Sequence, residues 1–96
     1  MMVLITYDVS TIDKNGEKRL RKISKECVNY GQRVQNSVFE CVLDNAQLKK
    51  LQHKLLLIMD KEKDSLRFYN IGNNYKNKIE HYGVKPSYDA EELLII

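Results

Sequence analysis

The chain has 96 residues and a formal net charge of +3, with 43% hydrophobic and 30% charged residues. This length suits one domain and this composition suits an ordinary soluble globular protein, while two cysteines are too few for a disulfide framework. No apolar run approaches the roughly 18 residues that span a bilayer, and the N-terminus has neither a basic leader nor a cleavage site. We therefore expect a cytoplasmic protein whose modest core would gain buried area from dimerisation.

The first expected element is a buried strand over residues 2–7 that ends at Asp8, because this run is apolar and β-branched. Side chains alternate between the two faces of a strand, so Val3, Ile5 and Tyr7 share one face. Asp8 belongs to the other face. If the first set meets the helices, Asp8 lies on the open side of the sheet.

A loop over residues 9–16 leads to a helix expected over residues 17–30, with Gly31 as its stop. Apolar side chains recur at three- and four-residue steps, and this stripe consists of Leu20, Ile23, Cys27 and Tyr30. The net charge is too mild to indicate a nucleic-acid partner, but its distribution is informative. Basic residues crowd into this helix and just beyond it: Lys18, Arg19, Arg21, Lys22, Lys25 and Arg33. They form either an ordinary solvated face or a set of phosphate contacts that do not read sequence.

Residues 33–43 are extended in character, and both parities carry apolar side chains. This pattern predicts either one long strand covered on both faces or two strands joined at Asn36-Ser37. Asp44 is a natural N-cap for a second helix over residues 45–60. The buried stripe of that helix is Leu48, Leu51, Leu55 and Ile58.

Three further segments follow in chain order: a charged turn over residues 61–64, a strand over 65–71 and a short strand over 78–82. Residues 83–89 then form a linker, and residues 93–96 are four large apolar side chains. These need a surface to pack on, either the chain's own sheet or that of a neighbouring subunit. We divide the chain into a domain over residues 1–82 and a linker with a C-terminal strand over residues 83–96.

Strands that alternate with two amphipathic helices predict an α+β sandwich with both helices on one face of a small sheet. A ferredoxin-like β-α-β-β-α-β arrangement is the favoured fold at this length. It leaves the other face of the sheet bare, and an open face with apolar residues invites a symmetric partner. The pattern therefore favours a homodimer.

The cysteines and histidines do not predict a zinc site, because the spacings of Cys27, Cys41, His53 and His81 match no ligand pattern. Both cysteines lie within apolar stretches, where a free cysteine behaves as a small hydrophobe. We expect buried, reduced thiols, and histidines that are exposed or half-buried.

The candidate site is the carboxylate of Asp8. A strand fixes the position of a side chain at its end, although strands also end in Asp simply to start a turn. One Asp is a poor cage for Mg²⁺, which takes six oxygen ligands, but two copies of Asp8 that meet at a two-fold axis could share one ion. For Tyr7 and Phe39, a position in the core or an interface is favoured over stacking on bases.

Several segments of the chain resemble the small CRISPR-associated endonuclease family called Cas-two: LITYDVST, KRLRKI, GQRVQNSVFEC, SLRFYNIGNNYK and the final LLII. The strand-final Tyr-Asp pair and the string from Arg33 to Phe39 are together specific, and the likeness is greatest to members of type I-C systems. The resemblance implies a ferredoxin-like protomer with a break at Asn36-Ser37. It also implies a homodimer in which each C-terminal strand lies against the partner's sheet.

The resemblance further implies that Asp8 is the catalytic residue and binds Mg²⁺ at the dimer interface. Its nucleic-acid-binding positions match Tyr7, Arg19, Arg21, Arg33 and Phe39. The implied activity is cleavage of single-stranded RNA or double-stranded DNA, and the implied partner is the CRISPR integrase, whose dimers the protein bridges during spacer acquisition. Three functions remain open: a metal-dependent nuclease, a non-catalytic DNA-binding scaffold and a toxin-type ribonuclease of the same fold.

Overall fold

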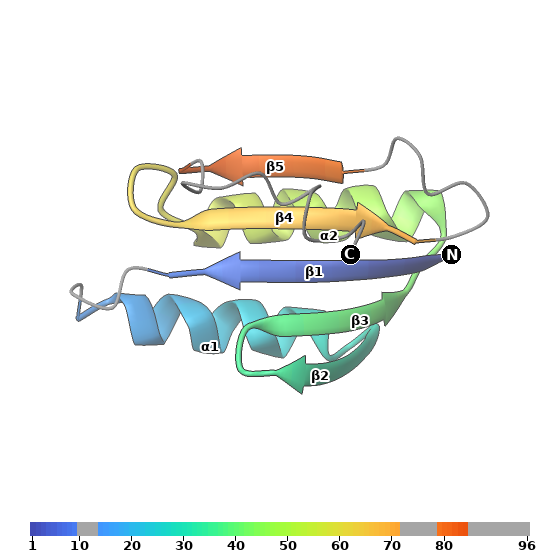
Figure 1. Ribbon diagram of the computed structural model, residues 1–96, viewed down its shortest axis with the longest axis horizontal. Coiled ribbons are helices and arrows are strands. Elements are labelled where there is room, and N and C mark those ends of the chain that lie inside the picture. Colours follow the sequence, from blue (N-terminus) through green and yellow to red (C-terminus); the bar gives the residue numbers. More distant parts are fainter. Residues whose placement is uncertain (10–13, 72–78, 85–96) are drawn as a thin grey trace, which may run out of the picture.

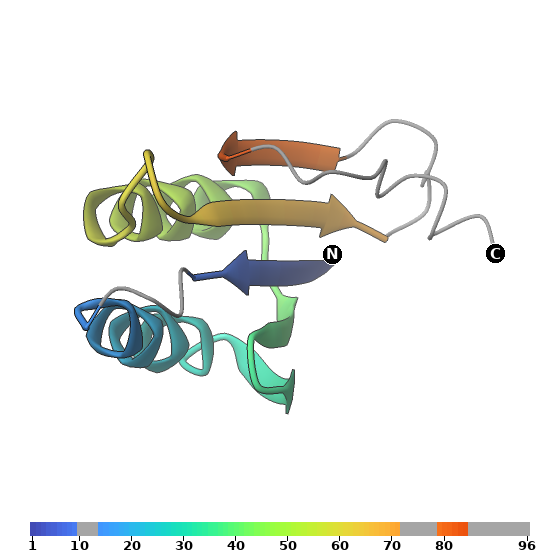
Figure 2. The same cartoon turned by 60° about the vertical axis from the view of Figure 1, so that its left-hand side comes forward.

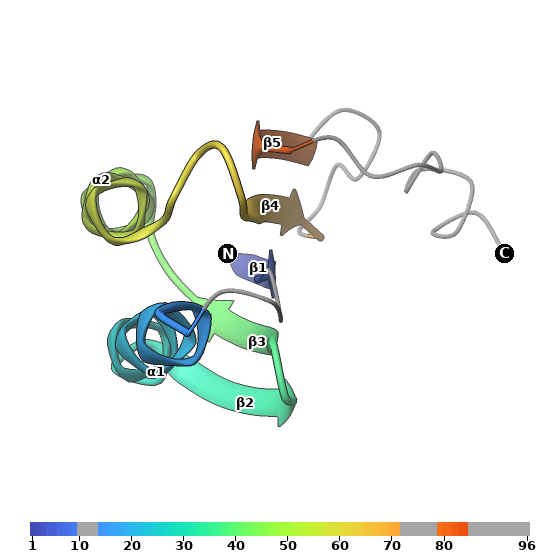
Figure 3. The same cartoon turned by 90° about the vertical axis from the view of Figure 1, so that its left-hand side faces the viewer.

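The computed structural model describes residues 1–9, 14–71 and 79–84 of the chain. The elements follow in the order β1 (Met2–Asp8), α1 (Gly16–Cys27), β2 (Gly31–Gln35), β3 (Val38–Val42), α2 (Asn45–Ile58), β4 (Ser65–Asn70) and β5 (Ile79–Gly83). The strands form one antiparallel sheet in the order β2-β3-β1-β4-β5 (Figure 1). Both helices cover the same face of this sheet (Figure 3). The predicted ferredoxin-like sandwich is thus confirmed, with β5 added beside β4.

The core lies between the helices and the sheet, and the central strand β1 contributes one face to it. Val3 and Ile5 are 0% exposed and Tyr7 is 1% exposed, whereas Asp8 is exposed. Ile5 lies opposite Phe39 of β3 on one side and opposite Phe68 of β4 on the other. The predicted alternation along this strand is therefore confirmed, and Asp8 belongs to the open face.

Helix α1 ends three residues earlier than predicted, at Cys27. The amides of Asn29 and Tyr30 close tight turns, and the Tyr30 carbonyl already accepts the Val42 amide at 2.9 Å, so the chain has joined the sheet by this point. Gly31 does not stop the helix but begins β2. A Cβ at Gly31 would lie 1.8 Å from the Glu40 carbonyl oxygen, so the close approach of β2 to β3 requires the glycine.

The extended segment forms two strands and not one, with a turn at Asn36-Ser37. All five residues of β2 are exposed, as suits a strand at the edge of the sheet. Its register against β3 shifts between Arg33 and Gln35. This irregularity has the character of a β-bulge, which bends a strand and increases its twist.

Helix α2 begins where the sequence predicts. The Asp44 carboxylate accepts the Gln47 amide at 2.7 Å, and the Gln47 side chain accepts the Asp44 amide at 2.9 Å, which completes a capping box. The helix ends at Ile58, two residues earlier than predicted, because Met59 is extended and packs into the core. Within the predicted stripe, Leu51 and Leu55 are 0% exposed, and the outer members are partly buried.

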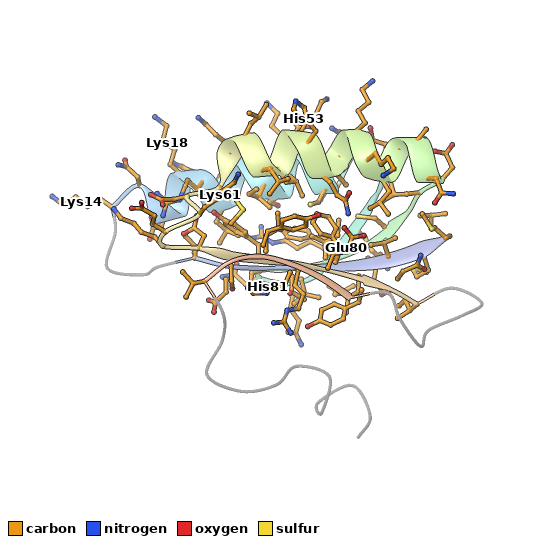
Figure 4. All side chains as sticks on the ribbon, turned by 90° about the horizontal axis from the view of Figure 1, so that it is seen from above. Lys14, Lys18, His53, Lys61, Glu80 and His81 are labelled. Atoms are coloured by element: carbon orange, nitrogen blue, oxygen red, sulfur yellow. The ribbon has the colours of Figure 1, made fainter. Side chains whose placement is uncertain are left out.

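The predictions for the cysteines and histidines are confirmed, whereas most of the predicted C-terminal segment is not among the described residues. Cys27 and Cys41 are free and buried, as predicted. His53 is exposed and His81 is half-buried, also as predicted, with His81 on the open face away from both helices (Figure 4). Among the described helices, none is both long and apolar enough to cross a membrane. Apart from Gly83 and Val84, the predicted linker and C-terminal strand over residues 83–96 lie outside the described residues.

Candidate metal and nucleic-acid site at the end of the central strand

Several elements meet where β1 ends. The first turn of α1, the turn between α2 and β4, and the end of β5 lie at the same end of the molecule as the tip of β1 (Figures 1 and 2). The amide of Tyr7 donates to the Ser37 carbonyl at 2.9 Å, which brings the β2–β3 hairpin to this end as well. Asp8 pairs with Ser65, the first residue of β4. The two neighbours Tyr7 and Asp8 point to opposite faces, and their surroundings differ completely.

The Asp8 carboxylate lies on the open face of the sheet. It is exposed, and none of the described residues forms a hydrogen bond or an ion pair with it. A hard carboxylate in this state is a suitable ligand for Mg²⁺. Among the described residues, no three His, Cys, Asp or Glu side chains come together to hold a metal ion. Asp8 therefore fits a metal site only if a second subunit, water or phosphate supplies the other ligands.

Tyr7 is directed into the core, where its hydroxyl donates to the Asp64 carboxylate. Asp64 is 0% exposed and also accepts two hydrogen bonds from Arg19, from Nε at 2.7 Å and from a terminal nitrogen at 2.9 Å. The Asp60 amide donates to the same carboxylate at 3.0 Å. We call Tyr7, Arg19 and Asp64 the Asp64 cluster. It joins β1, α1 and the α2–β4 turn through one buried carboxylate.

The electrostatics of the Asp64 cluster favour an ionised Asp64 and a neutral Tyr7. Burial alone would raise the pKa of Asp64, but the hydrogen bonds from Arg19, Tyr7 and the Asp60 amide, with the charge of Arg19, together hold this pKa below its ordinary value. Burial and the hydrogen bond to Asp64 raise the pKa of Tyr7. Tyr7 therefore keeps its proton and donates it in the hydrogen bond to Asp64. Arg19 and Asp64 form the ion pair of the cluster.

Arg33 and Phe39 lie on neighbouring strands, and they differ in accessibility. Phe39 is 0% exposed, whereas Arg33 is exposed with its guanidinium 5.7 Å from the centre of the Phe39 ring. Arg33 also donates to Asn36, to the backbone oxygen at 2.7 Å and to the side-chain oxygen at 3.1 Å. The rings of Tyr7 and Phe39 occupy the core, as the sequence favoured, and neither presents a surface on which a base could stack.

The helix layer carries a second feature, which we call the basic helix surface. Its exposed cations are Lys18, Arg21, Lys22, Lys25, Lys49, Lys50 and Lys54. Lys18 of α1 and His53 of α2 both point away from the sheet (Figure 4). Arg19 does not belong to this surface, because its side chain is only 13% exposed and turns inward to Asp64. The basic helix surface and Asp8 face opposite sides of the sheet.

The structure thus separates the predicted site residues into three groups. Asp8 lies on the open face and is not bonded to any of the described residues, Arg21 and Arg33 are exposed cations, and Tyr7 and Phe39 are buried. Arg19 belongs with the buried group, because it is bound to Asp64. Sequence reasoning missed Asp64, which it included in the charged turn over residues 61–64. The one available signal was its position immediately before a buried strand, and that signal does not distinguish a buried acid from an exposed one.

The family model described as CRISPR associated protein Cas2 matches residues 1–79 of the chain. The chain belongs to the Cas2 family. A Cas2 protein of Halalkalibacterium halodurans, named a CRISPR-associated endonuclease, is 62% identical over 99% of both chains. A Cas2 protein of Nitratidesulfovibrio vulgaris, named a CRISPR-associated endoribonuclease, is 62% identical over 100% of this chain and 94% of its own. The predicted resemblance to this family is confirmed, and the type I-C assignment stays a prediction.

Solved structures of similar chains have the same fold. The crystal structure of Streptococcus pyogenes Cas2 at pH 6.5 has a TM-score of 0.73 and 54% identity, and the match covers 79% of this chain and 92% of that one. A hypothetical protein from Thermus thermophilus, TT1823, has a TM-score of 0.65 and 33% identity, with 88% of this chain and 93% of that one covered. The arrangement of strands and helices around Asp8 is therefore that of the Cas2 fold.

Proposed function

We propose that this chain is a CRISPR-associated endonuclease that hydrolyses phosphodiester bonds in RNA, double-stranded DNA or both, with Mg²⁺ as cofactor and Asp8 as its ligand. Membership of the Cas2 family supports a nuclease, since similar family members are named endonuclease or endoribonuclease. The observation that carries the proposal is the Asp8 carboxylate, which is exposed and unengaged among the described residues at the end of a central strand that pairs on both sides. Within this proposal the protein acts in the cytoplasm.

The proposal includes a homodimer that buries the open face. Met2 and Val42 lie opposite each other on this face and are 37% and 64% exposed, and Leu4 beside them is half-buried. A second copy would remove this apolar surface from water. If the two-fold axis passes near the ends of the β1 strands, Asp8 and the partner's Asp8 together would hold one ion. The C-terminal strand against the partner's sheet remains part of this proposal.

Each part of the site has a distinct chemical role in this proposal. When bound, Mg²⁺ would lower the pKa of a coordinated water and neutralise the charge that develops on the phosphate. Asp8 fixes the position of the reaction through its place at the strand end. Arg21 and Arg33 are exposed cations that would contact phosphate without reading sequence. This proposal assigns no nucleic-acid contact to Tyr7, Arg19 or Phe39, because all three side chains are buried or nearly so.

One observation favours a second function, a non-catalytic scaffold that holds DNA and bridges CRISPR integrase dimers. The basic helix surface is separated from Asp8 by the thickness of the sheet, since the two belong to opposite faces. A duplex held by the cations of this surface would not need Asp8. Binding and cleavage are therefore separable in one molecule, and the two functions do not exclude each other.

The decisive experiment compares the wild type with Asp8→Asn on single-stranded RNA and on duplex DNA, with and without Mg²⁺. The nuclease proposal expects cleavage only by the wild type and only with Mg²⁺, while Asp8→Asn still dimerises and binds DNA. Cleavage by Asp8→Asn at the wild-type rate would remove Asp8 from catalysis. Binding by both proteins without cleavage by either would leave the scaffold function.

A further inference from the structure

Asp64 uses its whole carboxylate to join separate elements at the Asp8 end of the molecule. Its two oxygens accept bonds from the Tyr7 hydroxyl, from two nitrogens of Arg19 and from the Asp60 amide. Among the described residues, no buried side-chain polar atom is left without a partner. A carboxylate that is buried and bonded in this way cannot shift without breaking several charge-assisted hydrogen bonds at once.

The backbone of Asp64 fixes a further element. Its carbonyl oxygen accepts the Val84 amide at 2.9 Å, directly after the end of β5. Gly83, with a φ of 94°, passes so close that an added Cβ would lie 2.1 Å from this oxygen. The strand ends of β1 and β5, the start of α1 and the α2–β4 turn are therefore all tied to one residue.

We infer that the Asp64 cluster is a positioning device for Asp8, and that Tyr7 and Arg19 contribute by holding the end of β1 and not by touching nucleic acid. Tyr7 is the covalent neighbour of Asp8, and its hydroxyl is bound on the core side. Arg19 gives its planar fork to Asp64 and is only 13% exposed. The kinetic part of this inference rests on the proposed function.

A strand end needs such support because terminal residues of β-strands open more readily than central ones. Loss of a residue that orients a metal ligand typically lowers metal affinity or activity by about 10–100-fold. The Asp64 cluster would supply this orientation from the core, while the opposite face of the same strand end stays free to bind its ligand.

The test uses Tyr7→Phe, which removes one hydroxyl, and Arg19→Lys, which keeps the positive charge but loses the two-pronged contact. Tyr82→Phe is the matched control, because the Tyr82 hydroxyl also donates to a carboxylate, that of Glu80 at 2.9 Å, but outside the Asp64 cluster. Both cluster variants conserve net charge and are milder than a change at Asp64 itself, which guards against loss of the fold.

The first measurement is hydrogen exchange of the amides in residues 6–9 and 16–19 of the full chain without metal or nucleic acid. We expect exchange at least several-fold faster in Tyr7→Phe and Arg19→Lys than in the wild type, and unchanged in Tyr82→Phe. Unaltered exchange in both cluster variants would overturn the inference. This readout does not depend on cleavage, so it decides the positioning role even if the wild type proves to be no nuclease.

The second measurement separates positioning from contact. We expect kcat with saturating RNA or DNA to fall about 10–100-fold in both cluster variants. We also expect the Kd for nucleic acid to stay within about twofold and its salt dependence to be unchanged, since no phosphate contact is lost. A weaker Kd with an intact kcat would assign Tyr7 and Arg19 to nucleic-acid contact and reject the inference.

Discussion

Two carboxylates, Asp8 and Asp64, lie at the same end of the sheet and on opposite sides of it. Asp64 is buried, and its oxygens are bonded to a tyrosine, an arginine and a backbone amide. Asp8 is exposed, and the described residues leave it unbound. A satisfied carboxylate stabilises the fold, whereas an unsatisfied one at a fixed position is available to a ligand. The comparison teaches that this end of the sheet has one carboxylate that holds the fold together and, under the proposed function, another that is left to bind a ligand.

The largest expected effect on stability is that of Asp64→Ala. It removes the acceptor for the Tyr7 hydroxyl and the carboxylate that pairs with Arg19 in the core, which we expect to cost about 3 kcal/mol, the lower end of the range because Arg19 reaches water. Urea unfolding at pH 7 would measure this loss as a lower midpoint. An unchanged midpoint would mean that the cluster contributes no net stability.

The same variant gives a pH signature. Because the folded pKa of Asp64 lies below its unfolded value of about 3.9, the ion pair contributes fully above that pH and its contribution is lost as the pH falls through the folded pKa. The difference in unfolding free energy between wild type and Asp64→Ala should therefore be nearly constant between about pH 5 and pH 7. It should shrink below about pH 4. A difference that persists undiminished in acid would show that packing, and not charge, is responsible.

A third carboxylate, Asp44, sharpens the comparison because it is exposed yet engaged. Its side chain caps α2 by accepting the Gln47 amide. We expect Asp44→Ala to lower the unfolding free energy by about 1 kcal/mol, less than the change at Asp64. Urea unfolding again measures it, and Asp44→Asn, which can also accept this bond, serves as the control. If Asp44→Ala and Asp44→Asn lowered the unfolding free energy equally, the loss would not be due to the helix cap.

The smallest expected effect on stability belongs to Asp8. Asp8→Ala breaks no bond among the described residues, so we expect the urea midpoint to stay within experimental error of the wild type. A clear destabilisation would show that Asp8 has a structural partner. A rise in stability together with loss of Mg²⁺ binding would agree with a carboxylate maintained for function at a cost to the fold.

Local pattern was sufficient to predict most of the fold and the position of Asp8. Alternation along β1 gave the buried face of Val3, Ile5 and Tyr7, and the cap at Asp44 gave the start of α2. The predicted end of α1 at Tyr30 was wrong, because the Tyr30 carbonyl accepts a hydrogen bond from the amide of Val42, which is distant in sequence. Tertiary pairing overrode the helical pattern there.

The composition of the site was only partly predictable for the same physical reason. Arg19 and Asp64 are separated by 45 positions in the chain, and each lies in a segment with other charges of its kind. Nothing local shows which arginine of a basic helix turns inward. Arg21, two residues later, remains on the basic helix surface. Burial of a charge is a property of the assembled fold, and a single sequence reports it weakly.

The irregular register of β2 has a consequence for how this molecule can assemble. An edge strand with a full row of open backbone groups can recruit another sheet and grow without limit. In β2 the shift between Arg33 and Gln35 interrupts that row, and Arg33 adds a charge to it. An incoming strand would lose register halfway along. The β2 edge of the sheet is therefore a poor template for the addition of further strands, which disfavours open-ended growth through this edge.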